Sequence, residues 1–260
     1  MKLRPFIKMV DFSILILSCD KYSPLWEPFF NRFNKYWPNY HKKVYLLSNF
    51  LNPNIEGIEN ITIGEDKDWS SNLLKGINLI DSEYIFILLD DVFLKKKIDK
   101  YYFESLITFI ETFKPNYLNT KSEPLPKGEK VSEFIWEIIK GSHYRCSVSN
   151  SFWNKKMLTK LLVEGESPWE FERNGSRRSN FYDGFYGTKK SLLDFHHVII
   201  GGKLSRNVIH LEDLKSKLIL ESFPPISKFK WIIFKLTIIR SFLFTKLIPQ
   251  KYQQLIRNIF

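Results

Sequence analysis

The chain has little cysteine: Cys19 and Cys146 are the two such residues among 260. Two cysteines do not make the disulfide framework of a small secreted domain, and a reducing compartment fits them. The sequence also lacks an internal repeat, and basic residues interrupt its apolar C-terminal stretch before a membrane-spanning helix could form. Its length suits one α/β domain with a full core, alone or with an appendage.

Acidic residues are also scarce, with 28 against 39 basic ones and a net charge of +11. Such a charge fits an anionic partner, which could be nucleic acid, a phospholipid surface or a phosphate-bearing substrate. No RNA- or DNA-binding motif is recognisable, and carboxylates at strand ends would repel a phosphate backbone. We therefore expect no nucleic-acid partner.

Apolar runs and amphipathic segments alternate along the chain. The pattern predicts strands at 12–17, 43–48, 61–63, 84–89 and 144–149, and helices at 25–36, 69–80, 101–113 and 153–163. A polar, proline-containing loop is expected at 120–132. Strands that alternate with helices are typical of an α/β fold, with a mostly parallel central sheet flanked by helices.

Two adjacent acids, Asp90 and Asp91, directly follow the apolar run 84–89. Open α/β sheets bind ligands beyond the carboxyl ends of their strands. A carboxylate pair there can hold a divalent cation, which in turn can hold a diphosphate. The alternative is a turn in which one of the acids caps a backbone N–H group.

A second acidic segment is Ser167-Pro168-Trp169-Glu170-Phe171-Glu172. Ser167 and Glu170 match a helix capping box with proline at the first helical position, so Glu170 has a structural alternative. Glu172 lies about 200° further round a helix and cannot share that role. Either acid could serve as a general base near a sugar hydroxyl. Trp169 could offer a platform to a sugar ring or simply pack in the core.

Basic and glycine-rich segments follow. Arg177 and Arg178 suit a phosphate or an acidic sugar, or else form a solvated basic loop. Lys203, after two glycines, could neutralise a diphosphate or sit exposed on a β-turn. His196 and His197 could add a metal ligand but could also be packed or exposed.

The order of these motifs resembles that of GT-A-fold, nucleotide-sugar-dependent glycosyltransferases of bacterial surface-polysaccharide and lipopolysaccharide synthesis. The resemblance spans about residues 10–210. Its carriers are Ser18-Cys19-Asp20 after the first strand, Asn72 on a helix, Asp90-Asp91 after the fourth strand, and Pro168 to Glu172.

The resemblance implies a role for each carrier. Ser18, Cys19 and Asp20 would contact the nucleoside, and Asn72 and Asp90 would also bind the donor. The family's acidic motif is Asp-any-Asp and holds Mn²⁺ or Mg²⁺, but here Val92 stands in place of the second acid. Asp91 is therefore the expected metal ligand. Without a bound cation, Arg177, Arg178 or Lys203 would have to offset the charge of the diphosphate. Inverting members use one carboxylate as base, and Glu170 and Glu172 occupy the matching region.

Residues 222–260 contain no acid, seven basic residues and many apolar ones. We expect them to form basic amphipathic helices on an anionic membrane surface, next to a catalytic domain of residues 1–221. A helical hairpin packed on that domain is the alternative.

The sequence thus predicts a glycosyltransferase that moves a sugar, from a donor expected to be UDP-linked, to a lipid-linked or cell-surface glycan. Its expected place is cytoplasmic, peripheral on the inner face of the plasma membrane. A nucleotidyltransferase is one alternative, although a glycine-rich loop after the first strand is missing. A non-catalytic membrane-associated partner with a degenerate fold is the other.

Overall fold

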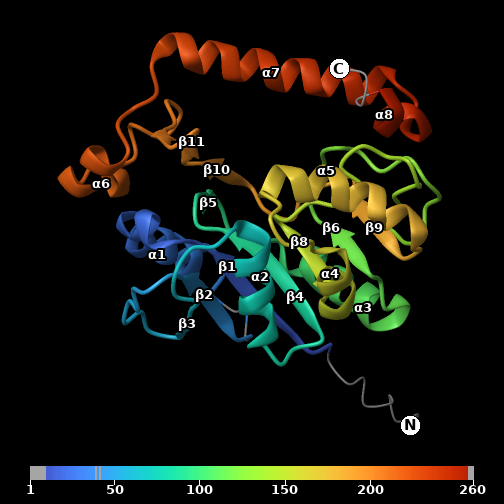
Figure 1. The fold of residues 1–260 in the computed structure, drawn as a ribbon, viewed down its shortest axis with the longest axis horizontal. Helices are drawn as coiled ribbons and strands as arrows, with labels where there is room; N and C mark the ends of the chain where they lie inside the picture. Colours follow the sequence, from blue (N-terminus) through green and yellow to red (C-terminus); the bar gives the residue numbers. More distant parts are fainter. Residues whose placement is uncertain (1–9, 39, 41, 257–260) are drawn as a thin grey trace.

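The computed structural model describes residues 10–38, 40 and 42–256. The first nine residues of the expected catalytic domain (1–221) and the last four of the expected C-terminal tail (222–260) lie outside the described residues. The predicted α/β fold is confirmed, and Figure 1 shows a central sheet with helices packed on it. The main sheet has eight strands, in the order β3 (Ile58–Thr62), β2 (Val44–Ser48), β1 (Phe12–Leu17), β4 (Tyr84–Leu89), β8 (Ser151–Asn154), β6 (Tyr117–Asn119), β9 (Phe185–Thr188) and β7 (Ile135–Glu137).

The sheet is mostly parallel. Strands β3, β2, β1 and β4 run parallel to one another. Strand β8 is antiparallel to both of its neighbours, β4 and β6, while β9 is parallel to β6. The carboxyl ends of six strands therefore meet at one edge, where α/β proteins place their ligands.

Helices cover both faces of the sheet. They are α1 (Trp26–Tyr36), α2 (Trp69–Asn78), α3 (Lys100–Phe113), α4 (Lys155–Leu161) and α5 (Pro168–Arg178). The side chains of β1 alternate between two buried cores because successive residues of a strand face opposite sides. Ile14 and Ile16 pack with α1 and α3, whereas Leu15 and Leu17 pack with α2, α4 and α5.

Two small antiparallel ribbons lie beside the main sheet. Strand β5 (Val92–Leu94) pairs with β10 (Phe195–His197), and β11 (Ile199–Ile200) pairs with β12 (Lys203–Leu204). Because β5 follows Asp91 directly, the first ribbon brings His197 opposite Val92, next to the acid pair.

The strand predicted at 144–149 is wrong. Those residues form turns, and β8 begins at Ser151. The reason is that their backbone N–H groups bind side chains instead of a neighbouring strand. Cys146 N donates to Ser176 Oγ (3.1 Å), and Val148 N donates to Glu172 Oε1 (3.2 Å). The following helix, α4, is correspondingly shorter than the predicted 153–163.

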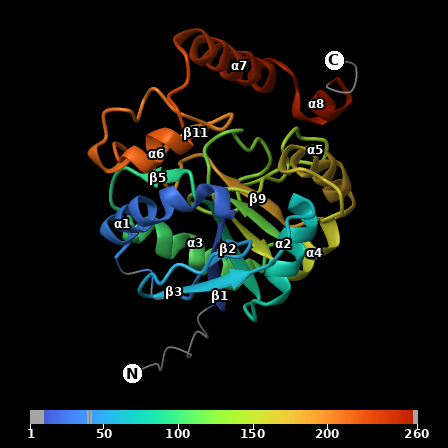
Figure 2. The same ribbon diagram turned by 60° about the vertical axis from the view of Figure 1, so that its left-hand side comes forward.

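The C-terminal segment is helical, as expected, with α6 (Lys217–Ser222), α7 (Lys228–Leu247) and α8 (Gln250–Ile256). Figures 1 and 2 both show α7 running across the top of the molecule. Its apolar residues are not confined to one side. Ile233 and Ile238, about 140° apart on a helix, are both exposed. In the described part of the chain, no helix is long and apolar enough to span a membrane.

Candidate active site

A cleft of about 690 Å³ opens at the carboxyl edge of the sheet. It lies where β1, β2 and β4 end and where α2 and α5 begin. The residues that line it are Leu17, Ser18, Cys19, Tyr22, Leu47, Asn49, Ile63, Asp66, Lys67, Asp68, Trp69, Asn72, Leu73, Leu89, Asp90, Asp91, Lys121, Val148, Ser149, Pro168, Trp169, Glu172 and His197.

The register of β1 against β4 brings Ser18 next to Asp90. Leu17 pairs with Leu89, so the residues that follow these two strands meet at the same level. The hydroxyl of Ser18 donates a hydrogen bond to the Asp90 carboxylate and accepts one from Trp26 Nε1 (2.7 Å). Ser18 therefore orients the first acid of the pair and is itself fixed by α1.

Both acids of the pair are electrostatically perturbed. Burial raises the pKa of Asp90 well above its usual range; the Ser18 hydrogen bond opposes this, and the nearby Asp91 adds to it. Burial also raises the pKa of Asp91, to about 6. Desolvation disfavours the charged form of a carboxyl group, and a cation bound beside the pair would offset this cost.

The donor set at the acid pair fits a divalent cation that is shared with a ligand. Oδ1 of Asp91 is buried and has no hydrogen-bond partner among the described residues. A buried oxygen without a partner is costly, and a metal–oxygen bond would satisfy it. The part of the chain that the structure describes holds no cluster of three metal-ligating side chains. Mg²⁺ usually needs one or two protein carboxylates, with substrate phosphates and water as its other ligands. Asp91, with or without Asp90, could supply the carboxylates.

Glu172 enters the cleft from α5 and is held in one orientation. Its Oε1 accepts hydrogen bonds from Ser147 Oγ (2.5 Å) and Val148 N (3.2 Å). Within the described chain, both hydrogen bonds of its carboxylate are made by Oε1. The other carboxylate oxygen remains available to a hydroxyl group in the cleft.

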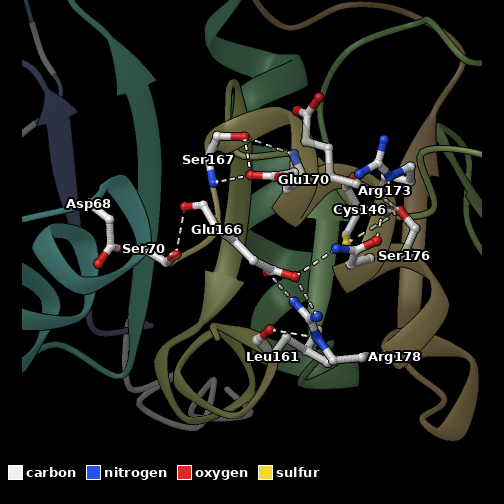
Figure 3. Close-up of polar contacts among 12 residues, drawn as sticks. Asp68, Ser70, Cys146, Leu161, Glu166, Ser167, Glu170, Arg173, Ser176 and Arg178 are labelled. Carbon is white, nitrogen blue, oxygen red and sulfur yellow. Dashed lines mark hydrogen bonds and ion pairs between the residues drawn. The ribbon is translucent and has the colours of Figure 1, made fainter. Parts of the chain in front are cut away.

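Glu170 forms the capping box of α5, so the structural interpretation of this residue is confirmed. Its Oε2 accepts from Ser167 N (2.8 Å), and Ser167 Oγ in turn accepts from Glu170 N (3.4 Å). Figure 3 shows this pair at the start of the helix. Glu170 is not among the residues that line the cleft. Of the two candidate bases, the structure brings only Glu172 to Asp90 and Asp91.

Three predicted cations lie outside the cleft lining. Arg178 forms an ion pair with the buried Glu166 (2.5 Å), drawn in Figure 3, and also donates to Leu161 O (3.0 Å). Arg177 is in the last turn of α5. Lys203 begins β12, after a turn in which Gly201 and Gly202 both have positive φ (56° and 72°). The structure therefore does not bring these cations to the acid pair.

Asp20 also lies outside the lining and joins two loops. Its carboxylate accepts hydrogen bonds from Asn49 N (3.0 Å), Phe50 N (3.0 Å) and Leu51 N (3.2 Å). Asn49 follows β2 and lines the cleft. Asp20 thus holds the loop after β2 against the loop after β1, while Ser18 and Cys19 face the cleft.

Aromatic rings from three segments line the cleft: Tyr22, Trp69 and Trp169. Trp169 is 74% exposed, so it is available to a ligand and is not a core residue. Tyr22 packs on Phe223 (ring centroids 5.2 Å apart). Asn72, on α2, also lines the cleft, and its amide donates to Asp66.

Lys121 was missed as a site residue because it falls in the segment predicted to be a polar loop. It follows β6, whose carboxyl end is at the same edge of the sheet as that of β4. The rule that singled out Asp90 would therefore have found it, had the three-residue strand Tyr117–Asn119 been recognised. Its Nζ donates to Ser147 Oγ (2.8 Å), the hydroxyl that also binds Glu172.

No protein-family model and no curated protein matches the sequence. Solved structures with a similar arrangement include S. aureus TarS 1-349, with a TM-score of 0.45 and 11% identity over 69% of this chain and 60% of that one. The same protein in complex with UDP-GlcNAc has a TM-score of 0.45 and 11% identity over 72% of this chain. The bifunctional IspDF from Campylobacter jejuni has a TM-score of 0.40 and 15% identity, over 65% of this chain and 47% of that one. The chain thus spans 60% of the length of the TarS fragment.

Proposed function

We propose that this chain is a glycosyltransferase that transfers a sugar from a nucleotide-sugar donor, with UDP as the expected nucleotide, to a glycan hydroxyl. The observation that carries the proposal is the cleft itself. It combines a perturbed acid pair at the carboxyl edge of the sheet, three aromatic rings and one fixed carboxylate, Glu172. The acid pair suits a cation with a diphosphate, and aromatic faces suit a base and a sugar.

The chemistry is a single displacement at the anomeric carbon. The acceptor oxygen forms a bond to that carbon, the bond between the carbon and the diphosphate oxygen breaks, and the hydroxyl proton passes to Glu172. Such a reaction needs a positioned base and stabilisation of the leaving diphosphate. A divalent cation held by Asp91 and Asp90 would supply charge to the leaving group. One displacement inverts the configuration of the sugar.

We place the acceptor at a membrane surface, as a lipid-linked or cell-surface glycan. The support is α7, which carries Lys228, Lys230, Lys235, Arg240 and Lys246 and no acid. Side chains such as Phe229 (73% exposed) and Leu236 (59%) project from it without a covering element. Cations and apolar side chains together favour an anionic leaflet. The enzyme would then act as a peripheral protein on the cytoplasmic face of the plasma membrane.

The test is thermal unfolding of the protein with UDP, GDP, CDP, CMP, ADP and CTP, each with Mn²⁺ and with EDTA. A ligand that binds only the folded state raises the melting temperature, by about 2.7 kcal/mol of stability at 100 times its Kd. We expect UDP to give the largest increase and EDTA to reduce it.

Other outcomes would contradict the proposal in distinct ways. A shift with CTP alone would favour a nucleotidyltransferase. The absence of any shift would favour a non-catalytic membrane-associated partner. If UDP raises the melting temperature equally with Mn²⁺ and with EDTA, the proposed glycosyltransferase activity stands and the proposed bound cation is wrong.

A further inference from the structure

The cleft is rich in acids, although the chain as a whole is strongly basic. Its lining includes five carboxylates and two lysines, Lys67 and Lys121; the carboxylates are Asp66, Asp68, Asp90, Asp91 and Glu172. A donor diphosphate would meet repulsion there unless positive charge offsets these acids.

The two lysines differ in how much of their charge is available. The Lys67 side chain is 69% exposed, and it forms an ion pair with Glu164 (3.0 Å). Lys121 is half-buried, and the described chain offers it no ion pair. Its ammonium has three N–H donors, and one of them is used, in the bond to Ser147 Oγ (2.8 Å).

Burial lowers the pKa of Lys121, while the charge of Glu172 opposes that shift. Burying an ammonium without a paired anion costs free energy. A bound anion would relieve this cost, so the position of Lys121 is explained if an anionic ligand lies beside it. His197 also lines the cleft, and burial and the charge of Lys121 lower its pKa. Its side chain does not supply a negative charge that could pair with Lys121.

We propose that Lys121 binds the diphosphate of the nucleotide donor, and that Ser147 couples this binding to the orientation of Glu172. The inference rests on the proposed function and deepens it. Ser147 Oγ accepts from Lys121 Nζ (2.8 Å) and donates to Glu172 Oε1 (2.5 Å), so one hydroxyl links the cation to the candidate base. Lys121 takes the diphosphate role that the sequence assigned to Arg177, Arg178 or Lys203.

The first test compares binding of UDP and of uridine to the wild type and to Lys121→Gln by calorimetry, in EDTA and in Mn²⁺. Glutamine keeps a donor for Ser147 and removes the charge. We expect UDP affinity to fall about tenfold or more, because a charge-assisted contact is lost, while uridine affinity changes by less than about twofold. Lys121→Arg should recover most of the UDP affinity.

Lys67→Gln is the matched control, since Lys67 lines the same cleft but is exposed and paired. It should change UDP affinity by less than about threefold. Wild-type affinity for UDP in Lys121→Gln would overturn the inference, as would equal losses for UDP and uridine. Failure of the wild type to bind either ligand would instead overturn the proposed function.

The coupling is tested with Ser147→Ala, in hydrolysis of a UDP-sugar with water as acceptor. The kcat of this variant should fall about tenfold, because the carboxylate loses its orienting hydroxyl, and its UDP affinity should fall less than that of Lys121→Gln, because the ammonium charge remains. Unchanged kcat would overturn the coupling. Melting temperatures of all variants, and Lys121→Met as a second uncharged variant, separate these effects from loss of the fold.

Discussion

Asp90 and Asp91 are two neighbouring carboxyl groups whose burial in the charged form costs folding free energy. The pKa of Asp91 rises from 3.8 to about 6 on burial, and that of Asp90 also rises. Between pH 3.8 and about 6, the unfolded chain has lost the Asp91 proton while the folded chain keeps it. Folding stability therefore falls as pH rises through this window and stays reduced above it, by about 3 kcal/mol.

Replacing Asp91 by asparagine should relieve that cost. We expect Asp91→Asn to raise the melting temperature at pH 7.5 in EDTA, and to raise it much less at pH 4, where the wild-type carboxyl is already protonated. The same variant should lose any stabilisation by Mn²⁺ with UDP. Thermal unfolding at both pH values checks this. An equal change at pH 4 and pH 7.5 would show that burial of the charge is not the cause.

Glu172 and Glu170 are two positions apart and make a matched pair for mutation. Glu172→Gln should reduce turnover about 100-fold or more, with UDP binding kept, because the base is lost. Glu170→Gln should leave turnover nearly unchanged and lower stability only slightly, because a partner in the capping box is weakened. Donor turnover and urea unfolding of both variants give the answer. Loss of turnover in Glu170→Gln alone would reverse the assignment.

At the scale of single elements, helix α5 shows how local rules position a functional residue. Pro168 and the capping box of Ser167 and Glu170 determine where the helix begins. Phe171 is buried in the core beneath it. The start of the helix and its buried side together fix how the helix is rotated about its axis. Glu172 therefore points into the cleft. Residues without a chemical role therefore decide where the candidate base lies.

Helix α7 leaves much of its surface exposed, although Phe244 packs on His143 (ring centroids 6.1 Å apart). Both of its ends are anchored. Ile226 N donates to Leu204 O (2.9 Å) before the helix, and His143 N donates to Gln253 Oε1 (3.2 Å) after it. Gln254 Nε2 adds a bond to Ser142 O (2.7 Å). Membrane binding by α7 would consequently orient the whole domain, cleft included.

The double variant Leu236→Asp with Ile239→Asp tests this surface. These residues are 59% and 53% exposed, so the change should not disturb the core. Binding to vesicles that contain phosphatidylglycerol should fall about tenfold or more, since both apolar burial and net charge are reduced. Cosedimentation measures it. Leu79→Asp, at a site that is 61% exposed on the end of α2, is the control. Unchanged vesicle binding, or a dimer that only the double variant dissociates, would argue against a membrane partner.

At the scale of the whole molecule, charge is distributed unevenly. The chain carries +11, yet the cleft gathers five carboxylates. The basic residues concentrate elsewhere, notably on α7. Net charge therefore reflects mainly the outside of the molecule. In the cleft, the proposed diphosphate donor would need positive charge between its phosphates and these acids.

The α/β class, the two strands that Ser18 and Asp90 follow, and the capping box were determined by the sequence alone. Each depends on neighbours in the chain, through apolar periodicity or through spacing of three residues. Only the tertiary structure decided which charged residues share the cleft. It brought Lys121, Ser147 and Glu172 together from three segments. It also paired Arg178 with Glu166, so that Arg178 does not face the cleft. The physical reason is that strand order and burial set these distances, and neither is encoded by the local pattern around any one residue.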